Sequence, residues 1–529
     1  MSVSFALSFV LAAALAIPGQ PRAAPACPGG IVYRDADRDG RHGPDEPGVA
    51  GVRVSDGVDI VETDAEGRYR LQARADRPRF IVKPPGYRVP DATNGLPAFW
   101  RTPDETGAAC GDFALWSADA RPDDAPLEVR VMADPQPKST VDVDYYARDI
   151  VEPLLASSGP GDAPADLGLS LGDIVNDDLS LYPAMIAQTV RLGVPWLHVA
   201  GNHDLDGGAA DDSASLATFR RHFGPDTFAW ETPQASFLLF DDVVHMPGAS
   251  PSYVGGLRED QFRFIEAYLA GARRDRLLVL GVHIPFFDAA PGRETFRHED
   301  RARLFRLLEP FDRVLLLSGH GHVQQHVWHG PSSGWHGPRP LHEYNVGAAC
   351  GAFWSGVADA QGIPDATMSD GTPNGHARMD IDAGGDYRLA WLPARDATGE
   401  RSGMSLHAPR VLRRGAWPGF AVYANVFMGD ADSRVEYRID GGEWTPMTRV
   451  VQADPRVLAT NLADDAAETL RGYDRAPEAK PSQHLWRGSL PTDLAAGEHR
   501  IEVRARDRWR GELQAWSAYR LVEREVGVE

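Results

Sequence analysis

Five short apolar runs alternate with helical patterns between residues 125 and 397, and this alternation restricts the fold more than any other feature of the sequence. The apolar runs read LEVRVMA, DLGLSL, PWLHVA, RLLVLGV and RVLLLS, and patterns such as YYARDIVEPLLAS and REDQFRFIEAYLAGAR accompany them. This arrangement predicts an α/β domain built in layers, whose functional side chains follow the ends of the strands.

The segments on either side of this domain show the short polar–apolar alternation of antiparallel β-structure. At 529 residues the chain is too long for one hydrophobic core, so several domains are expected. GVRVSD and GRYRLQA predict a small β-domain over 27–119, and FAVYANVF and GEHRIEVRARDRW predict a β-rich domain over 401–529. We therefore expect a multi-domain chain in which β-sandwich-like domains flank a central domain over 120–400.

The first 26 residues predict a secretory signal peptide. Phe5 to Ile17 form an apolar run that is short for a membrane span, and small residues suited to cleavage follow it. A retained anchor is the alternative, because no basic residue precedes the apolar run. No later stretch is long and apolar enough to cross a membrane. We therefore expect a periplasmic or secreted mature chain without a transmembrane segment, in which Cys27 and Cys110 are candidates for a disulfide.

The negative charge of the chain limits its partners. The formal net charge is −21, and only three of the 54 basic residues are lysines. An acidic surface repels a polyphosphate backbone, so no nucleic-acid partner is expected. This argument concerns the whole surface and leaves room for a small cationic pocket. The oligomeric state stays open.

An acidic segment near the N-terminus has the spacing of a calcium-binding loop. In DADRDGRHGPDE, alternating carboxylates precede a glycine, as in loops that wrap a hard cation in oxygen ligands. The candidate ligands are Asp35, Asp37, Asp39 and Glu46. The flanking segments read as strands, so an EF-hand is not implied, and an acidic surface turn is the alternative.

Residues suited to metal binding follow each apolar run of the central domain. One such motif alone is common in loops, but five of them directly after strands are hard to explain by chance. Buried carboxylates and imidazoles at one edge of a sheet are costly unless a cation pairs with them, so a two-metal site is expected. The residues concerned are Asp134, Gln136, Asp173, Asn202, His203, Asp204, His283, His320 and His322.

The ordered motifs DPQ, GDIVND, GNHD, a single His and GHGH resemble those of the calcineurin-like metallophosphoesterases. The two flanking β-domains resemble the architecture of an exported bacterial subfamily with one β-module on each side. The resemblance implies a four-layer α/β/β/α central domain and two divalent ions drawn from Mn, Fe, Zn or Co. It also implies hydrolysis of a phosphate ester by a metal-bridging hydroxide.

The resemblance further implies a role for each motif residue. Asp173 would bridge both ions; Asp134, Gln136 and His322 would complete one site, and Asn202, His283 and His320 the other. His203 would stand beside the scissile phosphate, with Asp204 holding its ring. Most of the family has His where this chain has Gln136, and a neutral amide would bind less tightly and favour a harder cation such as Mn²⁺. Alternatively, Gln136 orients a water and is no ligand.

The substrate is the least constrained feature. The loop LDGGAADDS carries Asp206, Asp211 and Asp212, which at the rim would disfavour polyanions, so a small phosphodiester is slightly favoured over a monoester. In the segment after His283, Arg293, Arg297 and His298 are candidate phosphate contacts, with an ordinary loop residue as the favoured alternative for each. The alternative function is an exported binding or surface protein with a catalytically silent phosphoesterase core.

Overall fold

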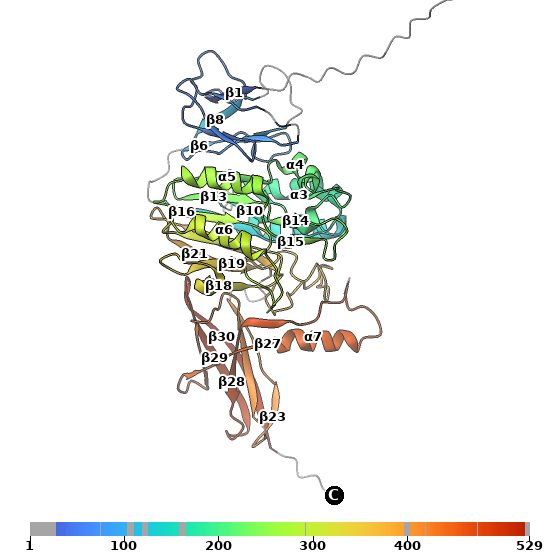
Figure 1. Cartoon of the computed structure of the whole chain (residues 1–529). Helices are drawn as coiled ribbons and strands as arrows, with labels where there is room; N and C mark the ends of the chain where they lie inside the picture. The colour runs from blue at the N-terminus through green and yellow to red at the C-terminus, as the bar shows by residue number, and fades with distance from the viewer. Residues whose placement is uncertain are drawn as a thin grey trace, which may run out of the picture.

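Three domains follow one another along the chain and along one axis of the molecule (Figure 1). The computed structural model describes residues 28–72, 74, 76–102, 111–118, 125–157, 165–290, 292–395, 403–417, 419–472 and 474–523. The signal peptide over 1–26 and the pair Cys27 and Cys110 lie outside these residues, so both remain predictions.

The central domain contains two sheets. The five-stranded sheet has the order β11 (Trp196–Val199), β10 (Leu167–Leu171), β9 (Leu127–Met132), β20 (Gly375–Ile381) and β21 (Tyr387–Pro393). The six-stranded sheet has the order β12 (Thr227–Glu231), β13 (Ala235–Phe240), β16 (Leu277–Gly281), β17 (Val314–Ser318), β19 (Leu341–Asn345) and β18 (Gln325–His329). A short hairpin of β14 (Val243–His245) and β15 (Tyr253–Gly255) stands beside them.

The two sheets pack face to face through their apolar side chains. Every residue of β10 and of β16 is buried. A Cβ at Gly281 in β16 would meet Leu239 Cδ2 of the neighbouring strand β13 at 2.5 Å and Leu171 Cδ2 of β10 in the other sheet at 3.4 Å. A larger side chain at this position would therefore require Leu239 to move.

Helices cover the outer face of each sheet. The helices are α1 (Thr140–Tyr146), α2 (Glu152–Ala156), α3 (Tyr182–Thr189), α4 (Ala217–Phe223), α5 (Glu259–Ala270) and α6 (His298–Leu308). Tyr146 of α1 bonds Met132 in β9 and Thr189 in α3 through its hydroxyl, at 3.3 Å in each case. On the other side, the Phe305 ring of α6 lies 5.1 Å from His329 in β18. The layers are therefore helix, sheet, sheet and helix.

The N-terminal domain consists of two four-stranded sheets. One runs β4 (Arg68–Arg70), β1 (Gly29–Arg34), β8 (Phe113–Ser117) and β6 (Tyr87–Arg88). The other runs β3 (Ile60–Glu62), β2 (Arg53–Ser55), β5 (Arg79–Ile81) and β7 (Trp100–Arg101). The Phe80 ring lies 5.8 Å from Phe264 of α5, and one hydrophobic core runs through this domain and the central one.

The C-terminal domain has a core of its own between two further sheets. The first runs β22 (Met404–His407), β24 (Phe420–Val426), β28 (Pro481–Leu490) and β27 (Thr448–Ala453). The second runs β23 (Val411–Arg413), β30 (Gly511–Val522), β29 (Gly497–Asp507), β25 (Arg434–Ile439) and β26 (Thr445–Pro446), and α7 (Pro455–Asp465) follows β27. The prediction of a central α/β domain flanked by β-domains is confirmed.

A buried polar cluster joins the C-terminal domain to the central domain. The Asp370 carboxylate accepts a hydrogen bond from the backbone amide of Gln324 at 2.8 Å and lies 3.1 Å from Nε2 of His484 in β28. Asn425 of β24 donates to the Asp370 carbonyl at 2.7 Å. Asp370 and His484 are each 1% exposed, so these bonds hold the two domains together without competition from water.

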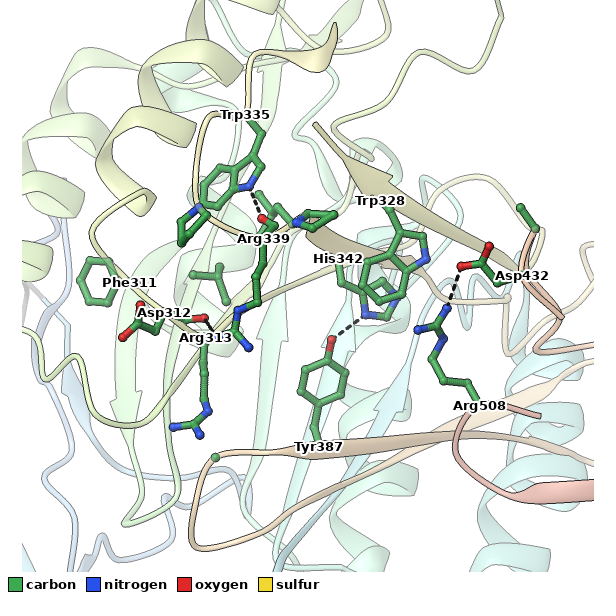
Figure 2. A pocket seen from close by; sticks show the side chains of 16 residues that line it. Phe311, Asp312, Arg313, Trp328, Trp335, Arg339, His342, Tyr387, Asp432 and Arg508 are labelled. Atoms are coloured by element: carbon green, nitrogen blue, oxygen red, sulfur yellow. Dashed lines mark hydrogen bonds and ion pairs between the residues drawn. The ribbon is translucent and has the colours of Figure 1, made fainter. Parts of the chain in front are cut away.

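A cavity of about 620 Å³ lies at the same junction, and we call it the Trp328 cavity (Figure 2). The His342 ring stacks on Trp328 at 4.2 Å, and its Nδ1 is hydrogen-bonded to the Tyr387 hydroxyl at 2.7 Å. From the C-terminal domain, the Arg508 guanidinium lies 4.7 Å from the centre of the Trp328 ring and pairs with Asp432 at 3.4 Å. The polar side chains at its centre therefore contact one another.

Within the residues listed above, no helix combines the length and apolar composition that a membrane span needs.

Candidate metal centre

The residues suited to metal binding come together because the strands before them are parallel. β9, β10 and β11 run parallel in one sheet, and β16 and β17 run parallel in the other. A parallel bridge between Ala133 and Ala348 joins the carboxyl ends of the two sheets. The loops that follow these strands therefore open toward one point.

Five of the seven predicted ligands have a left-handed backbone. The φ angle is 48° at Asp134, 41° at Gln136, 50° at Asp173, 66° at His320 and 48° at His322. Such angles are uncommon for residues with a Cβ and persist only where the surrounding structure holds them. Their concentration in these loops marks a site built for the direction of its side chains.

Asp173, His283 and His320 form one group of potential ligands, each offering an atom within 4.8 Å of the others. His283 Nε2 lies 3.4 Å from Asp173 Oδ2, 3.2 Å from His320 Nδ1 and 3.0 Å from Asn202 Oδ1. Four side chains from four loops thus face one point.

The His283 ring is oriented by the backbone. Its Nδ1 donates to the Leu171 carbonyl at 2.8 Å, so Nε2 is the nitrogen that faces the group. The Asp242 carboxylate accepts the amides of His283 and Ile284 at 3.0 and 3.1 Å. Metal-binding histidines are commonly fixed in this way through their second nitrogen.

Asp134, Gln136 and His322 lie beside this group. His322 Nδ1 donates to the Gly351 carbonyl at 2.8 Å, and its Nε2 lies 3.4 Å from Asp134 Oδ1. That buried oxygen has no hydrogen-bond partner among the described residues. Gln136 Nε2 donates to Asp173 Oδ2 at 3.3 Å, so ligation through its oxygen requires the amide to turn over.

The electrostatics of the group call for a cation. Burial lowers the pKa of His283, but the neighbouring Asp173 carboxylate outweighs burial and raises it to about 10. Burial and the nearby His283 lower the pKa of His320 to about 4. Two imidazole nitrogens face each other here beside a carboxylate, an arrangement that a proton on His283 or a bound cation stabilises. Nitrogen and oxygen donors of this kind suit divalent transition ions, so the residues of this group fit such an ion.

His203 lies at the edge of the centre, and its ring partner differs from the prediction. Its amide donates to Asp173 Oδ1 at 2.8 Å, and its Nδ1 lies 2.8 Å from Oδ1 of Asp177. Asp204 is buried and accepts the amides of Gly201 and Ile174 at 2.8 and 3.1 Å. The prediction that Asp204 holds the ring is therefore wrong, because its oxygens are turned inward to close the loop.

Three family models match the chain. The calcineurin-like phosphoesterase model matches residues 128–324, its N-terminal companion 36–117 and its C-terminal companion 343–512. The chain is a calcineurin-like phosphoesterase. It carries the N- and C-terminal modules of that family, as the resemblance implied.

Comparisons with individual proteins add solved structures only, since no curated protein matches this phosphoesterase. A dimetal phosphatase from Danio rerio shares 14% identity, covers 52% of this chain and 98% of its own, and has a TM-score of 0.35. A purple acid phosphatase from yellow lupin (Lupinus luteus) seeds shares 12% identity, covers 66% of this chain and 68% of its own, and has a TM-score of 0.38.

The predicted calcium loop of this phosphoesterase is compact. Asp35, Asp37 and Glu46 each offer an oxygen within 4.8 Å of the others. Both Asp35 oxygens accept backbone amides, at 2.7 Å from Arg38 and 2.9 Å from Gly40. Asp39 accepts the Arg41 amide at 2.8 Å and stands apart from the group. A calcium ion at this loop remains a prediction.

A groove of about 960 Å³, which we call the His320 groove, opens beside the centre. The central domain lines it with Tyr253, Arg293, His320 and Gln324 among others, and the C-terminal domain adds Val451, Lys480, Pro481 and Gln483. The sequence reasoning missed both this contribution and Asp177. Asp177 stands within the quoted motif GDIVND, so the motif could have suggested it, but no sequence signal places Lys480 there.

Proposed function

We propose that the protein is a metal-dependent phosphoric ester hydrolase that holds two divalent ions and cleaves a small phosphodiester in preference to a monoester. The observation that carries the proposal is the convergence of carboxylate, amide and imidazole side chains from five loops on one point. The residues are Asp134, Gln136, Asp173, Asn202, His283, His320 and His322.

When bound, two such ions supply a hydroxide at neutral pH and neutralise phosphoryl oxygens. Asp173 faces both ligand sets, since Oδ2 lies 3.4 Å from His283 and 3.3 Å from Gln136. The same carboxylate accepts the His203 amide, which fixes the distance between His203 and the centre. The Asp173 carboxylate thereby sets the position of the His203 ring relative to the predicted metal ligands.

His203 is the residue that moves a proton. Asp177 holds Nδ1, so Nε2 points away from the carboxylate, and 30% of the His203 side chain is exposed. Within the described part of the chain, no partner is recorded for Nε2. From there, a protonated ring stabilises charge on the phosphoryl group or donates a proton to the leaving oxygen, a contribution of roughly 10²–10⁴ in rate.

The alternative, an exported binding protein with a silent core, has less support. A core that has lost activity is expected to have lost some of its ligands, whereas all seven predicted ligands are retained here. The preference for a diester keeps weaker support, because the acidic loop that suggested it is engaged elsewhere. Asp206 accepts the Thr218 amide at 2.8 Å, and Asp212 pairs with Arg258 at 3.1 Å.

The test is release of p-nitrophenol from p-nitrophenyl phosphate and bis(p-nitrophenyl) phosphate, with added Mn²⁺ and with chelator. We expect metal-dependent release that is faster for the diester. Asp173→Ala should lose both metal and activity, whereas His203→Ala should keep its metal and lose turnover about 100-fold or more. His336→Ala, at an exposed histidine outside the centre, is the matched control.

Equal metal loss in the Asp173 and His203 variants would contradict these roles. No release by the fully metallated wild-type protein would favour the silent-core alternative.

We also propose that the protein is exported to the periplasm or secreted, on the strength of the apolar run from Phe5 to Ile17. Mass spectrometry of the protein recovered from a bacterial host checks this. A mature N-terminus near residue 27 in the extracytoplasmic fraction supports export, and an uncleaved chain in the cytoplasm contradicts it.

A further inference from the structure

The His320 groove continues from the metal centre to the C-terminal domain. His320 and Asn345 line the end beside the centre, and Lys480, Pro481 and Gln483 line the end formed by β28 and the segment before it. Its volume of about 960 Å³ is that of a site for a whole small ligand. A phosphate held at the centre fills only one end, so the rest of the substrate contacts the remaining walls.

Two cations in the groove lack protein partners. Arg293 from the loop after β16 and Lys480 from the C-terminal domain are both exposed. Among the residues that the structure describes, neither side chain has a recorded hydrogen bond or ion pair. Lysine is also rare here, with three in 529 residues. Their ammonium and guanidinium donors are free for a ligand.

The carboxylates of the groove, by contrast, are engaged. Both Asp288 oxygens lie 3.0 Å from His298 Nε2, and Glu294 accepts the His298 amide at 2.7 Å. The Asp370 carboxylate accepts hydrogen bonds from the backbone amides of Gln324 and Thr372 at 2.8 and 2.9 Å. Among the described residues, an anion entering the groove therefore meets the unpaired donors of Arg293 and Lys480, while at the end beside the centre the Asn345 Oδ1 acceptor is also without a partner.

A buried amide adds a third donor. Gln324 lines the groove and is 2% exposed, and its Oε1 accepts the Tyr344 hydroxyl at 2.8 Å. Its Nε2 has no hydrogen-bond partner in the described part of the protein. Buried amide donors are seldom left unpaired in folded proteins, so this one indicates a ligand or a bound water.

We propose that the His320 groove binds a second negatively charged group on the substrate, held between Arg293 of the central domain and Lys480 of the C-terminal domain. The substrate class is a phosphate ester whose organic part ends in a carboxylate or a second phosphate. The C-terminal domain then takes a direct part in substrate selection. This inference rests on the proposed function, because the metal centre must hold the first phosphate.

The test measures binding of alkyl phosphonates to the metallated full chain by calorimetry. Three chains of equal length end in a carboxylate, a phosphonate or a hydroxyl group. We expect the better of the two anionic ligands to bind about tenfold tighter than the hydroxyl ligand at low salt, since paired charges add to the contact. The carboxylate and phosphonate arms show which anion fits, and the preference should shrink as salt increases.

The variants assign the preference to residues. Lys480→Gln and Arg293→Gln should each reduce the ratio of anionic to hydroxyl affinity, and the double variant should bring it close to one. Arg306→Gln on α6 and Arg456→Gln on α7, both exposed and outside the groove, should leave the ratio unchanged.

Equal affinities in the wild-type protein, or a preference that survives the double variant, overturn the inference. A wild-type protein that binds none of the ligands contradicts both the inference and the proposed function. If only the proposed function is wrong, the protein will bind the anionic ligands selectively but release no p-nitrophenol.

Discussion

The two cavities at the junction of the central and C-terminal domains differ in what their polar side chains contact. In the Trp328 cavity, His342 bonds Tyr387 and Arg508 pairs with Asp432 (Figure 2). In the His320 groove, Arg293 and Lys480 have no recorded partner among the described residues, and the predicted metal ligand His320 lines one end. The size of a cavity therefore says little about its role. The unpaired charged donors of the His320 groove are the reason that we propose it, and not the Trp328 cavity, as the ligand site.

The largest expected difference in activity between the two cavities comes from replacing one histidine in each of them with phenylalanine. His320→Phe should lower kcat/KM for p-nitrophenyl esters by at least about 100-fold, because residues that merely orient a metal ligand are already worth 10- to 100-fold. His342→Phe should leave kcat/KM within about twofold, since distant sites act independently. Steady-state kinetics of both variants at saturating Mn²⁺ give the measurement. Comparable losses at both positions would mean that the two cavities are one functional unit.

A smaller effect is expected where the centre meets the His203 ring. Asp177→Asn should reduce kcat by about tenfold or more with little change in KM, because the amide holds the ring but stabilises its charged form less. Metal content by elemental analysis should stay at the wild-type level. Asp178→Asn, next to it in the same loop, is the control, since its amide oxygen can still cap the Ser180 amide. Lost metal in Asp177→Asn would instead make Asp177 part of the ligand cradle.

The smallest effect concerns acid stability at the Trp328 cavity. Burial and the neighbouring His326 lower the pKa of His342 well below 6.5. The unfolded chain therefore takes up a proton first as the pH falls, and the stability present above pH 6.5 is lost below it. We expect the melting temperature to drop by about a few degrees between pH 7.5 and 5.5 from this residue. His342→Phe should show a smaller drop over the same range, and an equal drop would assign the acid sensitivity to other groups.

The residues that follow strands were the predictable part of the site. The motifs around Asp134, Asp173 and His283 stand at strand ends, and parallel strands bring such ends together whatever the details of packing. The central α/β domain follows from the same alternation. The pattern of apolar runs thus predicts both the fold of the central domain and the approximate position of the candidate metal centre.

Two features depend on burial and on contacts between domains, which the pattern does not carry. Asp177 and Asp204 are both acids near His203, yet one is 73% exposed in its side chain and the other is buried under loop amides. Only the path of the loop decides which carboxylate reaches the ring. Lys480 lies far along the chain from every motif, and its place in the groove follows from the docking of the C-terminal domain around Asp370.

The left-handed backbone of five predicted ligand residues bears on how the proposed metal centre forms. The strands and backbone hydrogen bonds hold these conformations. For example, the Gln136 backbone amide donates to the Asp173 carbonyl at 3.0 Å. The loops therefore hold these side chains in place through contacts of their own backbone. If the centre binds metal as we propose, the ions can enter after folding, and their identity would reflect the supply in the compartment that the folded chain reaches.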